Sequence, residues 1–140
     1  MFSLEQRKKN TKIIINHSQK ILYKITGDNK LSGFLVVIIH WLIIGIPLIY
    51  LLFGKVTSLY YILSCLVYVV YAFQIYFKGC ILARIERDLF ETTEWWGPWI
   101  ILFKPIEYIG IQMHTELANK IINTGILLLT LVIIYKTTSI

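Results

Sequence analysis

Residues 33–54, GFLVVIIHWLIIGIPLIYLLFG, form a run of 22 uncharged positions and decide the fold. As an α-helix this run reaches about 33 Å, which matches a membrane hydrocarbon core of roughly 30 Å. Residues 57–77 form a second run of 21 uncharged positions, and Gly54–Lys55 supplies a short polar turn between the two runs. Because backbone polar groups in lipid must bond to each other, the two runs predict a transmembrane helical hairpin.

The composition of the whole chain agrees with a membrane location. Of its 140 residues, 56% are apolar and 16% are charged, whereas soluble domains contain about 45–50% apolar and about 25% charged residues. The apolar runs are continuous rather than alternating, which disfavours a β-barrel. We therefore expect an all-α integral membrane helical bundle rather than a water-soluble domain.

Two further apolar segments leave the number of spans open between three and four. Residues 95–113 are interrupted twice by proline, so this broken segment either crosses as a kinked helix or returns to the side it entered from. Residues 121–135 make a short span of about 22 Å, which flanking lysines extend at both ends. The expected organisation is a basic arm over residues 1–32, followed by a transmembrane domain over residues 33–140.

The basic arm carries most of the net charge of +6. Residues 12–26 project apolar side chains onto one side of a helix and lysines onto the other, and Gly27 suits its carboxyl-terminal cap. Such a basic amphipathic helix is expected to lie on the membrane surface and to bind anionic lipid headgroups. Docking on a protein is an alternative, whereas nucleic-acid binding is not expected, because the arm lacks an aromatic stacking platform. The lysines expected at the headgroups are Lys9, Lys12, Lys20 and Lys24.

The distribution of basic residues also predicts an orientation. The arm holds seven of them, whereas the first loop on the opposite side of the hairpin holds only Lys55. Cytoplasmic loops carry the excess of Lys and Arg in membrane proteins. The amino-terminus is therefore expected on the cytoplasmic, or matrix-like, side of the membrane.

Residues 80–94 connect the hairpin to the broken segment on the inner side. Their apolar side chains share one helical face, which predicts a short helix lying on the membrane. Charges of both signs occupy the remaining positions and are expected to be solvated and to pair with each other. The alternative is that Glu86 or Asp88 contacts a partner or another part of the inner surface.

Ionisable residues within apolar sequence are candidate functional sites, because they are costly to place in lipid. Lys104 and Glu107 lie three residues apart beside a proline, and they form either a structural ion pair or a site for an ion or a lipid headgroup. His40 lies eight residues into the first span. We expect it to be buried and hydrogen-bonded across helices, or to face Gln74 or a tyrosine.

Cys80 follows the second span at the inner interface, beside basic residues that favour its thiolate, so it is a candidate reactive or acylated thiol. No metal site is expected, because the chain lacks the paired ligand motifs of metal-binding bundles, and it carries no cofactor motif. A thiol- or metal-dependent enzyme would require Cys80 or His114 to converge with Glu86 or Glu107.

Several features together resemble a group of small four-span membrane proteins of unknown function. They are His40 in the first span, the segment 79–86 after the second span, and Trp95, Pro105 and Tyr108 in the broken segment. The Cys-x-Leu-x-x-x-Glu pattern that begins at Cys80 is also similar to one in predicted membrane proteins of giant DNA viruses. The resemblance covers residues 33–135. It implies a four-span bundle without an assigned catalytic activity.

The expected function is a structural or accessory one, as a small subunit of a larger membrane complex or as a virion membrane component. The expected partners are the lipid bilayer and other membrane protein subunits, and no enzymatic activity is expected. One alternative is a small channel or transporter subunit that uses Lys104 and Glu107. The other is the thiol- or metal-dependent membrane enzyme.

Overall fold

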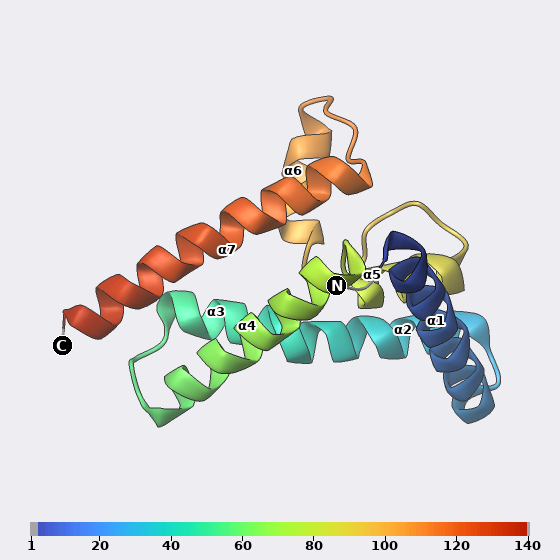
Figure 1. Cartoon of the computed structure of the whole chain (residues 1–140), viewed down its shortest axis with the longest axis horizontal. Coiled ribbons are helices and arrows are strands. Elements are labelled where there is room, and N and C mark those ends of the chain that lie inside the picture. The colour runs from blue at the N-terminus through green and yellow to red at the C-terminus, as the bar shows by residue number, and fades with distance from the viewer. Residues whose placement is uncertain (1–2, 140) are drawn as a thin grey trace.

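Helices account for all regular secondary structure in residues 3–139, the part of the chain that the computed structural model describes. The outer ends of the two expected regions, residues 1–2 and 140, lie outside it. The expected all-α class is confirmed for the described residues. In chain order the elements are α1 (Leu4–Thr26), α2 (Asn29–His40), a π-helical turn (Trp41–Gly45), α3 (Ile46–Phe53), α4 (Ser58–Phe77), α5 (Ile81–Phe90), α6 (Ile100–Tyr108) and α7 (Thr115–Thr138) (Figure 1).

Three helical stretches are long and apolar enough to cross a membrane. They are Asn29–Phe53, which joins α2 to α3 through the π-helical turn, Ser58–Phe77 in α4, and Thr115–Thr138 in α7. The first two correspond to the predicted hairpin. The third is longer than the predicted 121–135, because the polar turn that begins at Thr115 is helical as well. These three stretches are consistent with an integral membrane protein.

The broken segment contains only one short helix. Helix α6 is nine residues long and has Pro105 within it, so it reaches about 13 Å, less than half of the hydrocarbon core. It begins after Gly97–Pro98 and buries Phe103, whose ring meets the ring of Trp95 edge-on at 4.6 Å. Among the described residues the count of candidate spans is therefore three, and the broken segment is not one of them.

The first span contains a π-helical turn directly after His40. The backbone N–H of Ile46 donates to the carbonyl of Trp41, five residues back, instead of four. Pro47 lacks a backbone N–H and its ring crowds the carbonyl four residues before it, so a regular α-helix cannot continue through this point. A Cβ on Gly45 would lie 2.3 Å from the Trp41 ring, so only glycine fits beneath that indole.

Helix α1 folds back against α2 and α5 at one end of the molecule (Figure 1). Its end is set by Gly27, which has a left-handed backbone (φ 71°) and donates to the Tyr23 carbonyl, so the predicted cap is confirmed. Asp28 then caps α2 by accepting from the N–H of Leu31. Ile15 of α1 packs, with a few other apolar side chains, on a small buried cluster formed by Val36, Ile85 and Leu89.

At the opposite end, α7 runs along α3 and α4 and ends near the loop that joins them (Figure 1). The ammonium group of Lys136 donates to the carbonyls of Leu51 and Gly54, which are left without helical partners at the end of α3. The outer surface of these helices is rich in exposed leucine and isoleucine. An apolar surface of this extent fits lipid rather than water.

Candidate functional site

A buried ion pair joins α2 to α5. The Nδ1 atom of His40, the last residue of α2, lies 2.6 Å from Oε1 of Glu86, and the two side chains are 0% and 1% exposed. Burying a carboxylate is costly unless it is paired and hydrogen-bonded. This pair therefore satisfies two polar groups that the packing of α5 on α2 removes from solvent.

The packing of α5 explains why Glu86 points inward. Ile85 and Leu89 of the same helix are buried against Val36 of α2. Glu86 lies between them in sequence and faces the end of α2, so it meets His40 where that helix stops. Glu86 is therefore not among the solvated charges that the sequence predicts for this segment.

Cys80 approaches the other nitrogen of the same imidazole. Its Sγ atom lies 3.3 Å from Nε2 of His40. Cys80 holds this position because the chain turns sharply at the end of α4, where Lys78 and Gly79 have φ values of 53° and 142°. An L side chain rarely adopts the second of these values, so glycine is required directly before Cys80. The imidazole thus bridges the thiol and the carboxylate Glu86.

The environment of Cys80 favours its thiolate. Burial alone would raise the pKa of the Cys80 thiol, but the hydrogen bond with His40 and the positive charge on that imidazole outweigh burial and lower the pKa below that of an ordinary thiol. The backbone N–H of Ala83 acts in the same direction. The sulfur is therefore charged at a pH where an isolated thiol is mostly neutral.

The connector between α5 and α6 covers this group. A Cβ on Gly97 would lie 2.3 Å from Nδ1 of His40 and 3.0 Å from Oε1 of Glu86, so the connector backbone rests directly on the ion pair. Trp99 lies edge-on to the His40 ring at 6.4 Å between centroids. The guanidinium of Arg87 stacks on the Trp95 ring at 4.4 Å and anchors the start of the connector.

Two buried N–H groups beside this site have no acceptor among the described residues: Nε1 of Trp99 and Nε2 of Gln74. The indole N–H approaches the sulfur closely enough to lower the pKa of Cys80, without completing a hydrogen bond. Buried donors are nearly always paired, so two unpaired donors near one nucleophile call for an explanation. Gln74 lines the cavity that contains Cys80, and the Trp99 indole lies beside the His40 ring.

A cavity of about 240 Å³ opens beside Cys80. Gln74 and Cys80 are its polar members. The apolar residues of its wall come from the π-helical turn, α4 and α5, and they are Ile43, Ile44, Val70, Phe73, Phe77, Ile81 and Leu82. A cavity lined in this way accommodates an alkyl chain and presents it to the sulfur.

The structure places the sequence-predicted residues as follows. Lys104 and Glu107 form a surface pair with 4.0 Å between Nζ and Oε2, and their side chains are 57% and 34% exposed. The four lysines assigned to headgroups, Lys9, Lys12, Lys20 and Lys24, are exposed on α1. Neither set of residues contacts the group formed by Cys80, His40 and Glu86 through any hydrogen bond or ion pair found within residues 3–139.

His40 makes an interhelical polar contact, but its partners are Glu86 and Cys80 rather than Gln74 or a tyrosine. Cys80 and Glu86 converge, as the thiol alternative requires, with His40 between them. His114 caps the start of α7 and does not join this group. In the described part of the chain, no group of three or more His, Cys, Asp or Glu residues is arranged to hold a metal ion.

Sequence reasoning named Glu86 only in its alternatives and did not pair it with His40, and it missed Gly97. For Glu86 a signal existed, because at 100° per residue it projects within about 60° of both Leu82 and Leu89, on the apolar face of its helix. An acid on an apolar face is expected to have a buried partner. For Gly97 no signal existed, because its role depends on where the connector returns.

Compared with models of known protein families, with curated protein sequences and with solved structures, the chain gives no match.

Proposed function

We propose that this protein is a membrane-embedded, cysteine-dependent acyl-transfer enzyme. Cys80 is the nucleophile, His40 is the general acid and base, and Glu86 is the positioning residue that orients the imidazole. The observation that carries the proposal is the bridging imidazole, with 3.3 Å from Nε2 to the sulfur and 2.6 Å from Nδ1 to the carboxylate. A nucleophile in contact with a base that a third group orients is the recurring arrangement of covalent catalysis.

In the proposed resting site the Cys80 proton is already on Nε2 of His40, so a thiolate lies beside an imidazolium. The thiolate then attacks the carbonyl carbon of an ester or thioester, and a C–S bond forms as the carbonyl π electrons move to oxygen. When the tetrahedral intermediate collapses, the bond to the leaving alcohol or thiol breaks, and His40 returns its proton to that leaving group. Water or an acceptor alcohol then attacks the acyl–Cys80 thioester, with the now neutral His40 taking its proton, and the C–S bond breaks to restore the thiolate and the imidazolium.

The two unpaired buried donors supply the remaining requirement of this chemistry. The oxyanion of the tetrahedral intermediate needs preorganised N–H donors in a place that excludes water. Nε1 of Trp99 and Nε2 of Gln74 are buried and have no acceptor among the described residues. In the proposed enzyme they donate to the oxyanion.

The other functions expected from the sequence have weaker support. A channel or transporter subunit would need Lys104 and Glu107 in an internal path, whereas this pair is on the surface. The structural or accessory role, with other membrane subunits as partners, stays a prediction, and so does the absence of an activity. A metal-dependent enzyme lacks a ligand group among residues 3–139.

The proposal includes an orientation in the membrane. The amino-terminus lies on the cytoplasmic, or matrix-like, side, and α1 rests on that surface with its lysines toward anionic headgroups. Cys80 follows the end of α4 on the same side. The nucleophile then sits at the depth of the lipid headgroup boundary, where ester and thioester groups of lipids also lie.

The test is acylation of Cys80 in the full chain reconstituted in lipid nanodiscs. A long-chain p-nitrophenyl ester is added, release of p-nitrophenol is followed, and the acylated residue is located by mass spectrometry. We expect a burst of release with the acyl group on Cys80, and loss of the burst in Cys80→Ser, His40→Gln and Glu86→Gln. Cys65→Ser is the matched control, because Cys65 is an exposed cysteine of α4 outside the site, and it should keep the full burst.

Folding of each variant is checked by its thermal unfolding midpoint. Cys80→Ser changes one atom and is expected to keep the wild-type midpoint, so its loss of the burst reports chemistry. A burst that persists in Cys80→Ser, or an acyl group located only on Cys65, would refute the proposal.

A further inference from the structure

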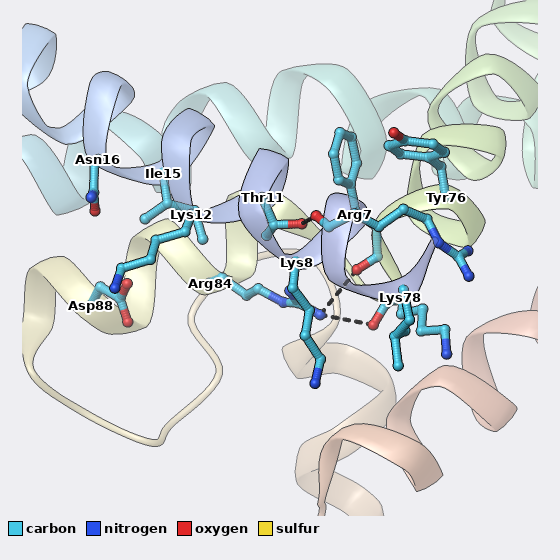
Figure 2. A pocket seen from close by; sticks show the side chains of 12 residues that line it. Arg7, Lys8, Thr11, Lys12, Ile15, Asn16, Tyr76, Lys78, Arg84 and Asp88 are labelled. Carbon is cyan, nitrogen blue, oxygen red and sulfur yellow. Dashed lines mark hydrogen bonds between the residues drawn. The ribbon is translucent and has the colours of Figure 1, made fainter. Parts of the chain in front are cut away.

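A second cavity, of about 470 Å³, lies between the first half of α1, the end of α4 and α5 (Figure 2). One acid, Asp88, lines it together with five basic residues. None of the five forms an ion pair with an acid within residues 3–139. The five, here called the basic cavity residues, are Arg7, Lys8, Lys12, Lys78 and Arg84.

Two of the basic cavity residues differ from the others in their surroundings. Arg84 donates from its guanidinium to the carbonyls of Phe77 and Lys78, at 3.2 and 2.8 Å, and so holds its charge at the end of α4 (Figure 2). Nε of Arg7 is buried and has no acceptor among the described residues. An unpaired guanidinium N–H in a basic cavity indicates a site that an anion completes.

The basic cavity adjoins the cavity beside Cys80. Phe77 lines both, and the chain passes from Lys78 on the first cavity through Gly79 to Cys80 on the second. The basic cavity is lined by five cationic side chains, whereas the cavity beside Cys80 is lined mostly by apolar ones. A ligand that spans both must therefore carry an anionic head and an apolar chain.

We infer that the basic cavity binds the phosphate of an amphiphilic substrate whose acyl chain lies in the cavity beside Cys80. This inference rests on the proposed acyl-transfer function and names its substrate class, an acylated phospholipid with a phosphate at its head. Arginine and lysine are the usual phosphate ligands of proteins, with arginine binding two oxygens at once. The site is distinct from a general attraction of α1 to anionic membrane, because it uses residues from α1, α4 and α5 together.

Binding is measured by calorimetric titration of the full chain in neutral detergent. The probes are short-chain phosphatidic acid, diacylglycerol with the same chains, glycerol 3-phosphate and inorganic phosphate. We expect phosphatidic acid to bind far more tightly than the other three, because it alone fills both cavities. Equal affinity for inorganic phosphate would overturn the role of the acyl chain, and equal affinity for diacylglycerol would overturn the role of the phosphate.

The variants remove two positive charges inside or outside the cavity. Lys8→Gln with Lys78→Gln removes exposed basic cavity residues, and Lys20→Gln with Lys24→Gln removes the same charge from another part of α1. Each Lys near an anionic group contributes a factor of about fivefold in affinity, so the first pair should weaken Kd for phosphatidic acid by roughly 25-fold. Lys20→Gln with Lys24→Gln should change Kd for phosphatidic acid by less than about threefold. The solvent screens these two charges, which lie away from the bound phosphate. An equal loss in both pairs would overturn the site.

The same titration with Cys80→Ser separates this inference from the proposed function. Unchanged binding in Cys80→Ser together with the expected burst in the wild-type chain supports both. Tight, Lys78-dependent binding without acylation of Cys80 in the wild-type chain would refute only the enzyme. Acylation of Cys80 without preference for phosphatidic acid would refute only the headgroup site.

Discussion

The close approach of Gly97 to the buried ion pair makes Gly97→Ala the most informative single substitution. The new methyl carbon would lie 2.3 Å from Nδ1 of His40 and 3.0 Å from Oε1 of Glu86. Both distances are shorter than ordinary van der Waals contact, so the imidazole, the carboxylate or the connector must move.

The size of the effect follows from these distances. Moving the His40 ring by about 1 Å, to a normal contact of roughly 3.4 Å, disturbs its hydrogen bond with Glu86, which is 2.6 Å long. Overpacking of this kind costs roughly 1–3 kcal/mol. We therefore expect Gly97→Ala to lower the free energy of unfolding by about 2 kcal/mol. The displaced imidazole should also hold the Cys80 thiolate less well, so the thiol should alkylate more slowly at neutral pH.

The measurements are the unfolding midpoint in detergent and the rate of Cys80 alkylation, both in a Cys65→Ser background that leaves one reactive cysteine. The matched control is Gly125→Ala in the middle of α7, where a Cβ meets nothing within 4 Å. That control should be neutral or slightly stabilising, by about 0.5–1 kcal/mol, because alanine favours a helix over glycine. If both alanine variants gave the same stability and the same alkylation rate, the contact between the connector and the ion pair would be refuted.

Three further predictions concern single interactions. His40→Gln should shift the pH profile of Cys80 alkylation to higher pH, because the thiol loses the hydrogen bond and the charge that lower its pKa most, while burial still raises that pKa. A profile unchanged between pH 6 and 9, a range set by an ordinary thiol pKa of about 8.5, would contradict this. Lys136→Met should lower the free energy of unfolding by about 1 kcal/mol, because the Gly54 carbonyl loses its donor while the Leu51 carbonyl keeps the hydroxyl of Tyr60. Lys120→Met removes only an exposed pair with Glu116 and should leave the unfolding midpoint unchanged. A double-mutant cycle on Lys104→Gln and Glu107→Gln should give a coupling below about 0.5 kcal/mol, as exposed pairs do; a coupling several times larger would show that the pair is desolvated.

Local features of this fold were predictable from the sequence. The two uncharged runs predict the hairpin because a membrane-spanning helix needs length and apolar side chains, both of which are visible in the letters. Gly27 predicts the end of α1 because few residues besides glycine adopt a left-handed cap easily. The sequence left the number of spans open between three and four, because the distribution of basic residues is the same whether or not residues 95–113 cross the membrane.

The candidate site depended on contacts that sequence patterns do not contain. His40 and Glu86 are separated by 46 residues, and they meet only because α5 folds back along α2 after the hairpin closes. Cys80 was recognisable as a thiol near basic residues, but its true partner is a histidine from the first span. Glu86 was expected among the solvated charges of its segment, and although its position on the apolar face of α5 was a signal of burial, no pattern indicated against which helix it would pack.

The π-helical turn divides the first span into two helices with a fixed rotational offset. The extra residue in this one turn rotates α2 relative to α3 by about 100°, compared with a continuous α-helix. This offset lets α2 direct His40 toward α5 while α3 packs against α7. Deletion of one residue within Trp41–Gly45 would rotate the two halves by about 100° relative to each other, so the two contacts could no longer form together.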